Sequence, residues 1–129
     1  VDLELERRAG DFVRGLIRIG AVSVVHDLSD GGLVAAAADM ALASNVGITL
    51  NATSHEHAHF YLFGEDQGRY LIAAADPDAL IAKAQTAGLH ASVAGHAGGA
   101  ALASEQGLFS VPLATLREAH EGWMPAYMA

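Results

Sequence analysis

The stretch His26-Asp27-Leu28-Ser29-Asp30-Gly31-Gly32-Leu33 decides the fold, because it reads as a tight turn between a strand and a helix. Before it, residues 21–25 are apolar and rich in valine, as expected for a short buried strand. After it, apolar residues recur at helical spacing over residues 33–41. The segment therefore predicts strand, turn and helix in succession, with Ser29 or Asp30 as the helix N-cap.

The same turn has the chemistry of a ligand site. The start of a helix presents free backbone N–H groups and a positive dipole end, which suit phosphate or another anion. Gly31 and Gly32 allow positive φ angles and close approach of the backbone to a ligand. Asp27 and Asp30 could instead hold a cation or a sugar hydroxyl. A purely structural interpretation also stays open, in which Asp30 caps the helix and the glycines only form the turn.

A second segment, Leu62-Phe63-Gly64-Glu65-Asp66-Gln67-Gly68-Arg69, places a polar cluster directly before an apolar strand predicted over residues 70–75. Together the two motifs resemble the C-terminal domain of the aminoimidazole-ribonucleotide-synthetase superfamily. Within it, the resemblance is greatest to the last domain of the phosphoribosylformylglycinamidine synthases, on the synthetase subunit. The opening residues 2–13 and the end, residues 116–128, agree with that family, so the resemblance covers essentially the whole chain.

The resemblance implies a ligase of de novo purine biosynthesis, which converts formylglycinamide ribonucleotide to formylglycinamidine ribonucleotide. Such an enzyme uses ATP, Mg²⁺ and ammonia, and its partners are a glutaminase subunit and a small accessory subunit. Residues 1–129 would be a single C-terminal domain of a longer chain, whose missing N-terminal domains supply most nucleotide and metal contacts. The fragment alone is then expected neither to be active nor to bind ATP or Mg²⁺.

The resemblance also bears on the site residues. In the first half of this internally duplicated enzyme, the motif matching Glu65-Asp66-Gln67 contacts the ribonucleotide substrate. This chain resembles the second half, and Asp66 stands where the first-half motif has serine, so we assign no catalytic residue. We expect one cleft facing the missing domain, lined by Asp27, Ser29, Asp30, Gly31, Gly32, Glu65, Asp66 and Gln67.

Composition limits the function classes. The 129 residues suit one domain, and a formal net charge of −8 opposes binding to nucleic acid or to an anionic membrane. There is no cysteine, no signal-peptide pattern and no apolar run of roughly 20 residues. A cytoplasmic protein is therefore the default expectation. Because the chain begins with Val1 and has no initiator Met, we interpret it as a piece of a longer protein.

The chain pattern predicts a mixed α/β (α+β) fold, in which helices pack on a mixed β-sheet. Helices are expected at residues 2–19, 33–47, 77–87 and 113–121, and strands at 21–25, 48–50, 70–75, 91–96, 100–104 and 107–111. The last three strands are expected to form a meander, with a hairpin turn at Gly95–Gly99.

Several residues have two interpretations. His55, His57 and His59 could offer three imidazoles to a metal, but without a partner motif a solvated loop is favoured and no metal site is predicted. His26 could bind phosphate or act as a base, yet a structural role is more common at a strand end. Trp123 and Tyr127 could stack on a base, but more often such residues pin a terminal tail to the body.

Two alternative functions remain open. The first is a stand-alone, non-catalytic interaction domain that forms a homodimer through an exposed apolar surface. The second is another enzyme of the superfamily, such as a thiamine phosphate kinase or a hydrogenase maturation factor. The Leu-Phe-Gly-Glu-Asp-Gln segment and the Trp-Met-Pro-Ala-Tyr end argue against the second alternative.

Overall fold

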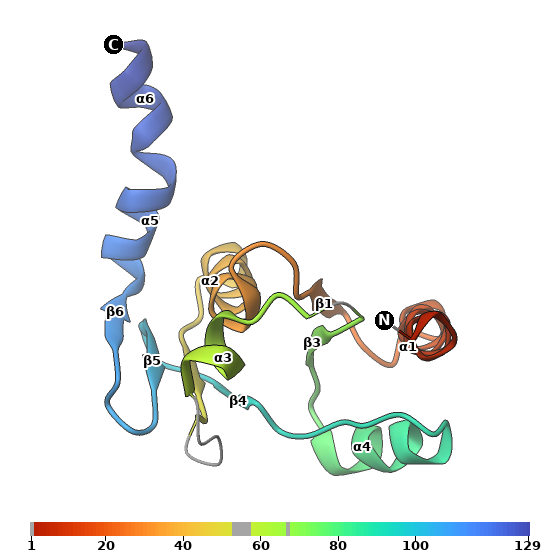
Figure 1. Ribbon diagram of the computed structural model, residues 1–129. Helices are drawn as coiled ribbons and strands as arrows, with labels where there is room; N and C mark the ends of the chain where they lie inside the picture. Colours follow the sequence, from red (N-terminus) through yellow and green to blue (C-terminus); the bar gives the residue numbers. More distant parts are fainter. Residues whose placement is uncertain (1, 53–57, 67) are drawn as a thin grey trace. The chain divides into compact units, whose positions relative to one another are not determined.

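The computed structural model describes residues 2–52, 58–66 and 68–129 (Figure 1). The chain divides into two compact units, one formed by residues 1–36 and 63–93 and the other by residues 37–62 and 94–129. Both units contain helices and strands, so the predicted mixed α/β class is confirmed. In the part of the chain that is described, no helix is long and apolar enough to cross a membrane.

Two helices of the first unit begin where local sequence signals place them. These are α1 (Leu3–Arg18) and α4 (Pro77–Thr86). Asp2 and Asp76 precede them, and each side chain accepts a backbone N–H from three residues further on, at 3.0 Å. These bonds satisfy N–H groups that have no partner within the helix. Both predicted helices are confirmed to within one residue or two at each end.

The first unit also contains a two-stranded antiparallel sheet of β1 (Val24–Asp27) and β3 (Tyr70–Ala73). The predicted strand 21–25 is wrong in position and in burial: β1 begins later, and its two end residues are exposed. The segment before it closes the end of α1, since Ala21 N–H donates to the carbonyl of Leu16 at 3.0 Å. The sheet register sets Asp27 opposite Tyr70, at the end where both polar motifs attach.

Helix α2 (Gly32–Ser44) follows the acidic turn. The prediction that Ser29 or Asp30 is its N-cap is wrong, because the helix begins at Gly32 and Gly31 stands between Asp30 and the helix. Gly31 and Gly32 have φ angles of 80° and 66°, so the chain is in the left-handed region at the residue before the helix and at its first residue. The helix ends at Ser44, and Asn45 follows with a φ of 54°.

The second unit is built on a four-stranded mixed sheet with the order β4-β2-β5-β6. Its strands are β2 (Ile48–Leu50), β4 (Gly95–Ala97), β5 (Ala101–Ser104) and β6 (Ser110–Pro112). Strand β2 is antiparallel to β4 and parallel to β5, whereas β5 and β6 form an antiparallel pair. The predicted meander is therefore wrong, because β2 lies between β4 and β5.

The predicted hairpin turn at Gly95–Gly99 is wrong for the same reason. Gly95 lies inside β4, and the glycine pair after the strand bonds to residue Gly47 just before β2. Gly98 N–H donates to the Gly47 carbonyl at 2.7 Å, and Gly47 N–H donates to the Gly99 carbonyl at 2.9 Å. A Cβ on Gly47 would clash with the carbonyl oxygens of Gly98 and Ala101, so the close approach of these backbone segments requires glycine at position 47.

Three further helices are α3 (Ala58–Phe63), α5 (Leu113–Glu121) and α6 (Trp123–Met128). The prediction of a loop over residues 54–59 is wrong at its end, since His59 lies in α3; His55 and His57 lie outside the described residues. The aromatic tail forms α6 and is not pinned to the body. The Trp123 and Tyr127 rings stack on each other, 5.5 Å apart, and are 63% and 77% exposed.

Candidate ligand-binding cleft

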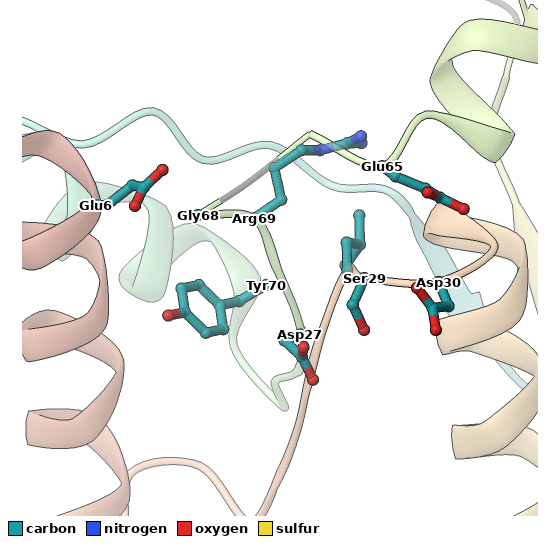
Figure 2. A pocket seen from close by; sticks show the side chains of 9 residues that line it. Glu6, Asp27, Ser29, Asp30, Glu65, Gly68, Arg69 and Tyr70 are labelled. Atoms are coloured by element: carbon teal, nitrogen blue, oxygen red, sulfur yellow. The ribbon is translucent and has the colours of Figure 1, made fainter. Parts of the chain in front are cut away.

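The register of the β1–β3 sheet brings the two polar motifs together. One motif follows the end of β1 and the other precedes the start of β3, and these two ends lie opposite each other. The pairing extends one step into the turns, where Leu28 N–H donates to the Arg69 carbonyl at 3.0 Å. A cleft of about 410 Å³ opens between the turns and α1, all within the first unit (Figure 2).

Four of the eight predicted site residues line this cleft. They are Asp27, Ser29, Asp30 and Glu65. Figure 2 shows Asp27, Ser29 and Asp30 in succession along the segment from β1 to α2, with Glu65 on the other segment. Glu65 bonds to Gly31, which is 34 residues away in the chain. Residues from both predicted motifs therefore line one cleft. Whether they bind a ligand stays a prediction.

The other four predicted residues are placed differently. Asp66 is exposed and does not line the cleft; its Oδ2 lies 3.6 Å from Nη1 of Arg69. Gly31 and Gly32 are not among the lining residues and form the turn itself. Gln67 lies outside the described residues.

Glu65 closes the start of α2. Its Oε1 accepts a hydrogen bond from the backbone N–H of Gly31 at 2.9 Å. A carboxylate is the side chain that the positive end of a helix prefers, and a charged acceptor makes a stronger bond than a neutral one. A carboxylate of the chain itself therefore accepts one of the backbone N–H groups at this turn.

The charge of the cleft is predominantly negative. Its lining contains the carboxylates of Glu6, Asp27, Asp30 and Glu65, and among the described lining residues Arg69 supplies the only positive charge. Arg69 Nη1 also lies 3.4 Å from the Gly64 carbonyl. This balance does not fit a triphosphate such as ATP, whose charges four carboxylates would repel. It favours the alternative in which the acidic side chains accept ligand hydroxyls or face a cationic group.

A metal centre is not assembled by these carboxylates. Among the described residues, no group of three or more histidine, aspartate and glutamate side chains is arranged to hold a metal ion. The Mg²⁺ that the resemblance implies is therefore not matched by a ligand set in the described part of this chain. His59 lies in α3, and the other two histidines of that stretch lie outside the described residues.

His26 contacts the backbone of its neighbour in the chain. Its Nδ1 lies 2.6 Å from the Asp27 carbonyl oxygen, which can only accept, so Nδ1 carries the proton and donates. The ring is about one-third exposed and is not part of the cleft lining.

Five of the nine described lining residues are not among the predicted site residues: Glu6, Leu28, Gly68, Arg69 and Tyr70. Glu6 comes from α1, and its Cγ lies 3.0 Å from the position of a Cβ on Gly68. No spacing rule links residue 6 to residue 68, because only the packing of α1 brings them together. Tyr70 is the first residue of the predicted strand and of β3, and its side chain lies beside α1, where its hydroxyl is 3.5 Å from a Cβ position on Gly10. Its position directly after the polar motif is a sequence signal that could have identified Tyr70 as a lining residue.

A family model described as AIR synthase related protein, C-terminal domain, matches residues 1–105. The chain belongs to this family. The match includes both polar motifs, the β1–β3 sheet and the cleft, and ends just after β5. The AIR synthase C-terminal family therefore accounts for the whole first unit, whereas β6, α5 and α6 lie beyond the matched residues.

Two curated relatives are similar over the whole chain. The phosphoribosylformylglycinamidine synthase subunit PurL of Caulobacter vibrioides is 67% identical over 129 residues, which are 100% of this chain and 17% of that protein. The same subunit of Rhodospirillum rubrum is 50% identical over 131 residues, again 100% of this chain and 17% of that protein. This member of the AIR synthase C-terminal family thus spans about a sixth of the length of these relatives.

Solved structures show the same fold. The chain superposes on T. maritima PurL complexed with FGAR with a TM-score of 0.72 and 17% identity, covering 86% of this chain and 20% of that one. For the structure of PurLQS from Thermotoga maritima, the TM-score is 0.73 at 17% identity, covering 86% and 21%. At this identity the likeness concerns the fold alone.

Proposed function

We propose that this chain acts as the C-terminal domain of a phosphoribosylformylglycinamidine synthase, on its synthetase subunit. The parent enzyme is then an ATP-dependent ligase that converts formylglycinamide ribonucleotide to formylglycinamidine ribonucleotide in purine biosynthesis. The observation that carries this proposal is the 67% identity to the Caulobacter vibrioides subunit across all 129 residues. A cytoplasmic location belongs to the same proposal.

Within the parent enzyme, the domain contributes a cleft and an interface and does not carry the reacting groups. The four carboxylates of the cleft support this division, since they would repel the triphosphate of ATP. ATP and Mg²⁺ would be held by the N-terminal domains of the same polypeptide. T. maritima PurL has been solved with ATP and with AMPPCP, which supports ATP as the cosubstrate of the parent enzyme.

The partners follow from the same proposal. The missing N-terminal domains would cover the cleft, and a glutaminase subunit and a small accessory subunit would complete the enzyme. The solved PurLQS structure supports an assembly of several subunits. In that assembly Asp27, Ser29 and Asp30 would offer oxygen acceptors toward the covering domain, where ligand hydroxyls could donate to them.

The deciding experiment uses the native polypeptide that carries these residues, captured from its source cells. It is assayed for ATP hydrolysis that depends on formylglycinamide ribonucleotide, with ammonium as the nitrogen source. Activity in a protein much larger than 129 residues, lost when the ribonucleotide is omitted, is the expected result. Absence of ribonucleotide-dependent hydrolysis would reject the synthase proposal and favour the non-catalytic interaction domain, for which light scattering would then report a homodimer.

A further inference from the structure

The two turns that form the cleft are joined by more than the strand pairing. Leu28 N–H donates to the Arg69 carbonyl at 3.0 Å, next to the last pair of the sheet. Further from the sheet, Gly31 N–H donates to Glu65 Oε1 at 2.9 Å. The second bond crosses 34 residues of sequence and is made by a side chain, so a single substitution can remove it without changing the backbone.

The start of α2 is also packed directly against the second turn. A Cβ built on Gly32 would lie 2.7 Å from the Phe63 carbonyl carbon and 2.8 Å from the Gly64 carbonyl oxygen. Both distances are far below van der Waals contact, so the two backbones approach as closely as glycine permits. Glu65 is the next residue in the chain after Gly64. Figure 2 shows its side chain extending toward the first residues of α2.

The carboxylate bonded at the start of α2 comes from a distant part of the chain. The first turn of the helix contains no acidic side chain, and Asp30 precedes the left-handed Gly31–Gly32 pair. The positive end of the helix dipole is therefore complemented by Glu65, from a distant part of the chain. Asp66, the neighbouring carboxylate, instead has Arg69 as its partner at 3.6 Å.

From these observations we propose that Glu65 is a positioning residue: its carboxylate latches the turn of residues 28–32 to the segment of residues 63–66 and so sets the width of the cleft. Its Oε1 accepts the Gly31 N–H, a bond between the two segments that no side-chain hydrogen bond of Asp27, Ser29 or Asp30 matches among the described residues. The link between the two segments is independent of the proposed function. Its effect on ribonucleotide use rests on that function.

Residue-resolved hydrogen exchange on the native polypeptide tests the latch. The readouts are the amides of Gly31, bonded to Glu65, and Leu28, bonded to Arg69. We expect Glu65→Ala to accelerate exchange at both amides by about tenfold, because the charged bond is lost and the turns separate. Glu65→Gln keeps an oxygen acceptor at the same reach and is expected to stay close to wild type.

Asp66→Ala is the matched control, since it removes one carboxylate from the same turn and leaves the Gly31 bond in place. Wild-type exchange at Leu28 and Gly31 is expected in this variant. The latch is rejected if Glu65→Ala accelerates Gly31 alone, if it accelerates neither amide, or if Asp66→Ala has the same effect. Each of these results would leave Glu65 with a local or purely electrostatic role.

A kinetic arm separates the latch from the proposed function. With ribonucleotide-dependent ATP hydrolysis as the assay, Glu65→Ala is expected to raise the KM for the ribonucleotide about tenfold with little change in kcat, and Glu65→Gln to restore it. If the wild-type polypeptide lacks this activity, the synthase proposal fails while the exchange experiment still tests the latch. If the wild type is active and the KM does not change, the latch does not position the site.

Discussion

Gly32 is the residue at which conformation and packing restrict the chain most tightly in the first unit. Its φ of 66° lies in the left-handed region, which costs an L-residue roughly 1 kcal/mol. Its missing Cβ is also required by the backbone of residues 63 and 64. The left-handed φ and the close backbone contact can be separated by experiment, because Gly20 has a left-handed φ and no such contact.

Gly32→Ala is expected to destabilise the chain by about 3 kcal/mol, the sum of the left-handed penalty and a clash with rigid backbone. Gly20→Ala is the control: its φ is 67°, and nothing lies within 4 Å of the added Cβ. That substitution is expected to cost about 1 kcal/mol. Urea unfolding of the three proteins measures the difference, and equal losses would show that the contact with residues 63 and 64 is absent.

The proposed role of Asp30 in the cleft can be tested directly by substitution. Asp30→Ala removes one oxygen acceptor from the lining and is expected to weaken ribonucleotide-dependent activity of the parent enzyme about tenfold. Asp78→Ala removes an exposed carboxylate from the first turn of α4 and is expected to leave activity unchanged. Equal activities of the two variants would remove Asp30 from the site.

At the scale of elements, α5 is joined to the C-terminal end of α2 by one side chain. Nη2 of Arg117 donates to the Leu42 carbonyl at 2.8 Å, and Nη1 donates to Glu121 at 2.6 Å. The carbonyls at a helix end have no partner within the helix, so the guanidinium satisfies one of them. This contact fixes the base of α5, which lies beyond the residues matched by the family model.

Arg117→Ala is expected to cost about 1.5 kcal/mol of stability, the value of a charged hydrogen bond to a partly buried carbonyl. Glu121→Gln removes only the exposed ion pair and is expected to cost less than about 0.5 kcal/mol. Thermal unfolding of both variants distinguishes the two bonds. A larger effect of Glu121→Gln would mean that the ion pair, and not the carbonyl bond, holds α5.

The first turn of α1 contains a pair whose effect depends on pH. Hydrogen bonding and charge attraction from Arg7 hold the pKa of Glu4 below its ordinary value. A lowered folded-state pKa stabilises the fold above the unfolded pKa, and this contribution is lost as the pH falls through the folded value. Glu4→Gln should therefore lower the melting temperature slightly near neutral pH and not in strong acid. A difference that persists in acid would exclude this pair as the cause.

At the scale of the whole molecule, the C-terminal end of the chain is exposed. Helix α6 has no buried residue, and Met124 and Met128 are exposed together with the two stacked aromatic rings. The chain has a single tryptophan, Trp123, so its fluorescence reports on this helix alone.

The emission of Trp123 is expected to resemble that of free tryptophan in water, since the side chain is 63% exposed. A soluble quencher such as iodide should reduce it almost as efficiently as it reduces the free amino acid. Unfolding in urea should then shift the emission only slightly. A blue-shifted emission that moves to the red on unfolding would show that α6 packs against another surface.

The sequence by itself determined the elements whose signals are local. The capped helices α1 and α4 follow from Asp2, Asp76 and Pro77, because a helix N-terminus is set by residues within one turn of it. The polar motifs around residues 27–30 and 64–69 and their family were also readable, since they depend on residue order alone. Their meeting in one cleft followed from the resemblance and not from spacing.

Only the tertiary structure decided which distant segments pair. Strand β2 lies between β4 and β5, although the glycines after β4 suggested a hairpin, because backbone bonds from Gly47 were available to them. Glu65 bonds to Gly31 at the start of α2, although Ser29 and Asp30 are nearer in sequence, because the tertiary fold brings residues 63–65 against the left-handed glycine pair. Such choices depend on competition among contacts far apart in the chain, and no local pattern contains that information.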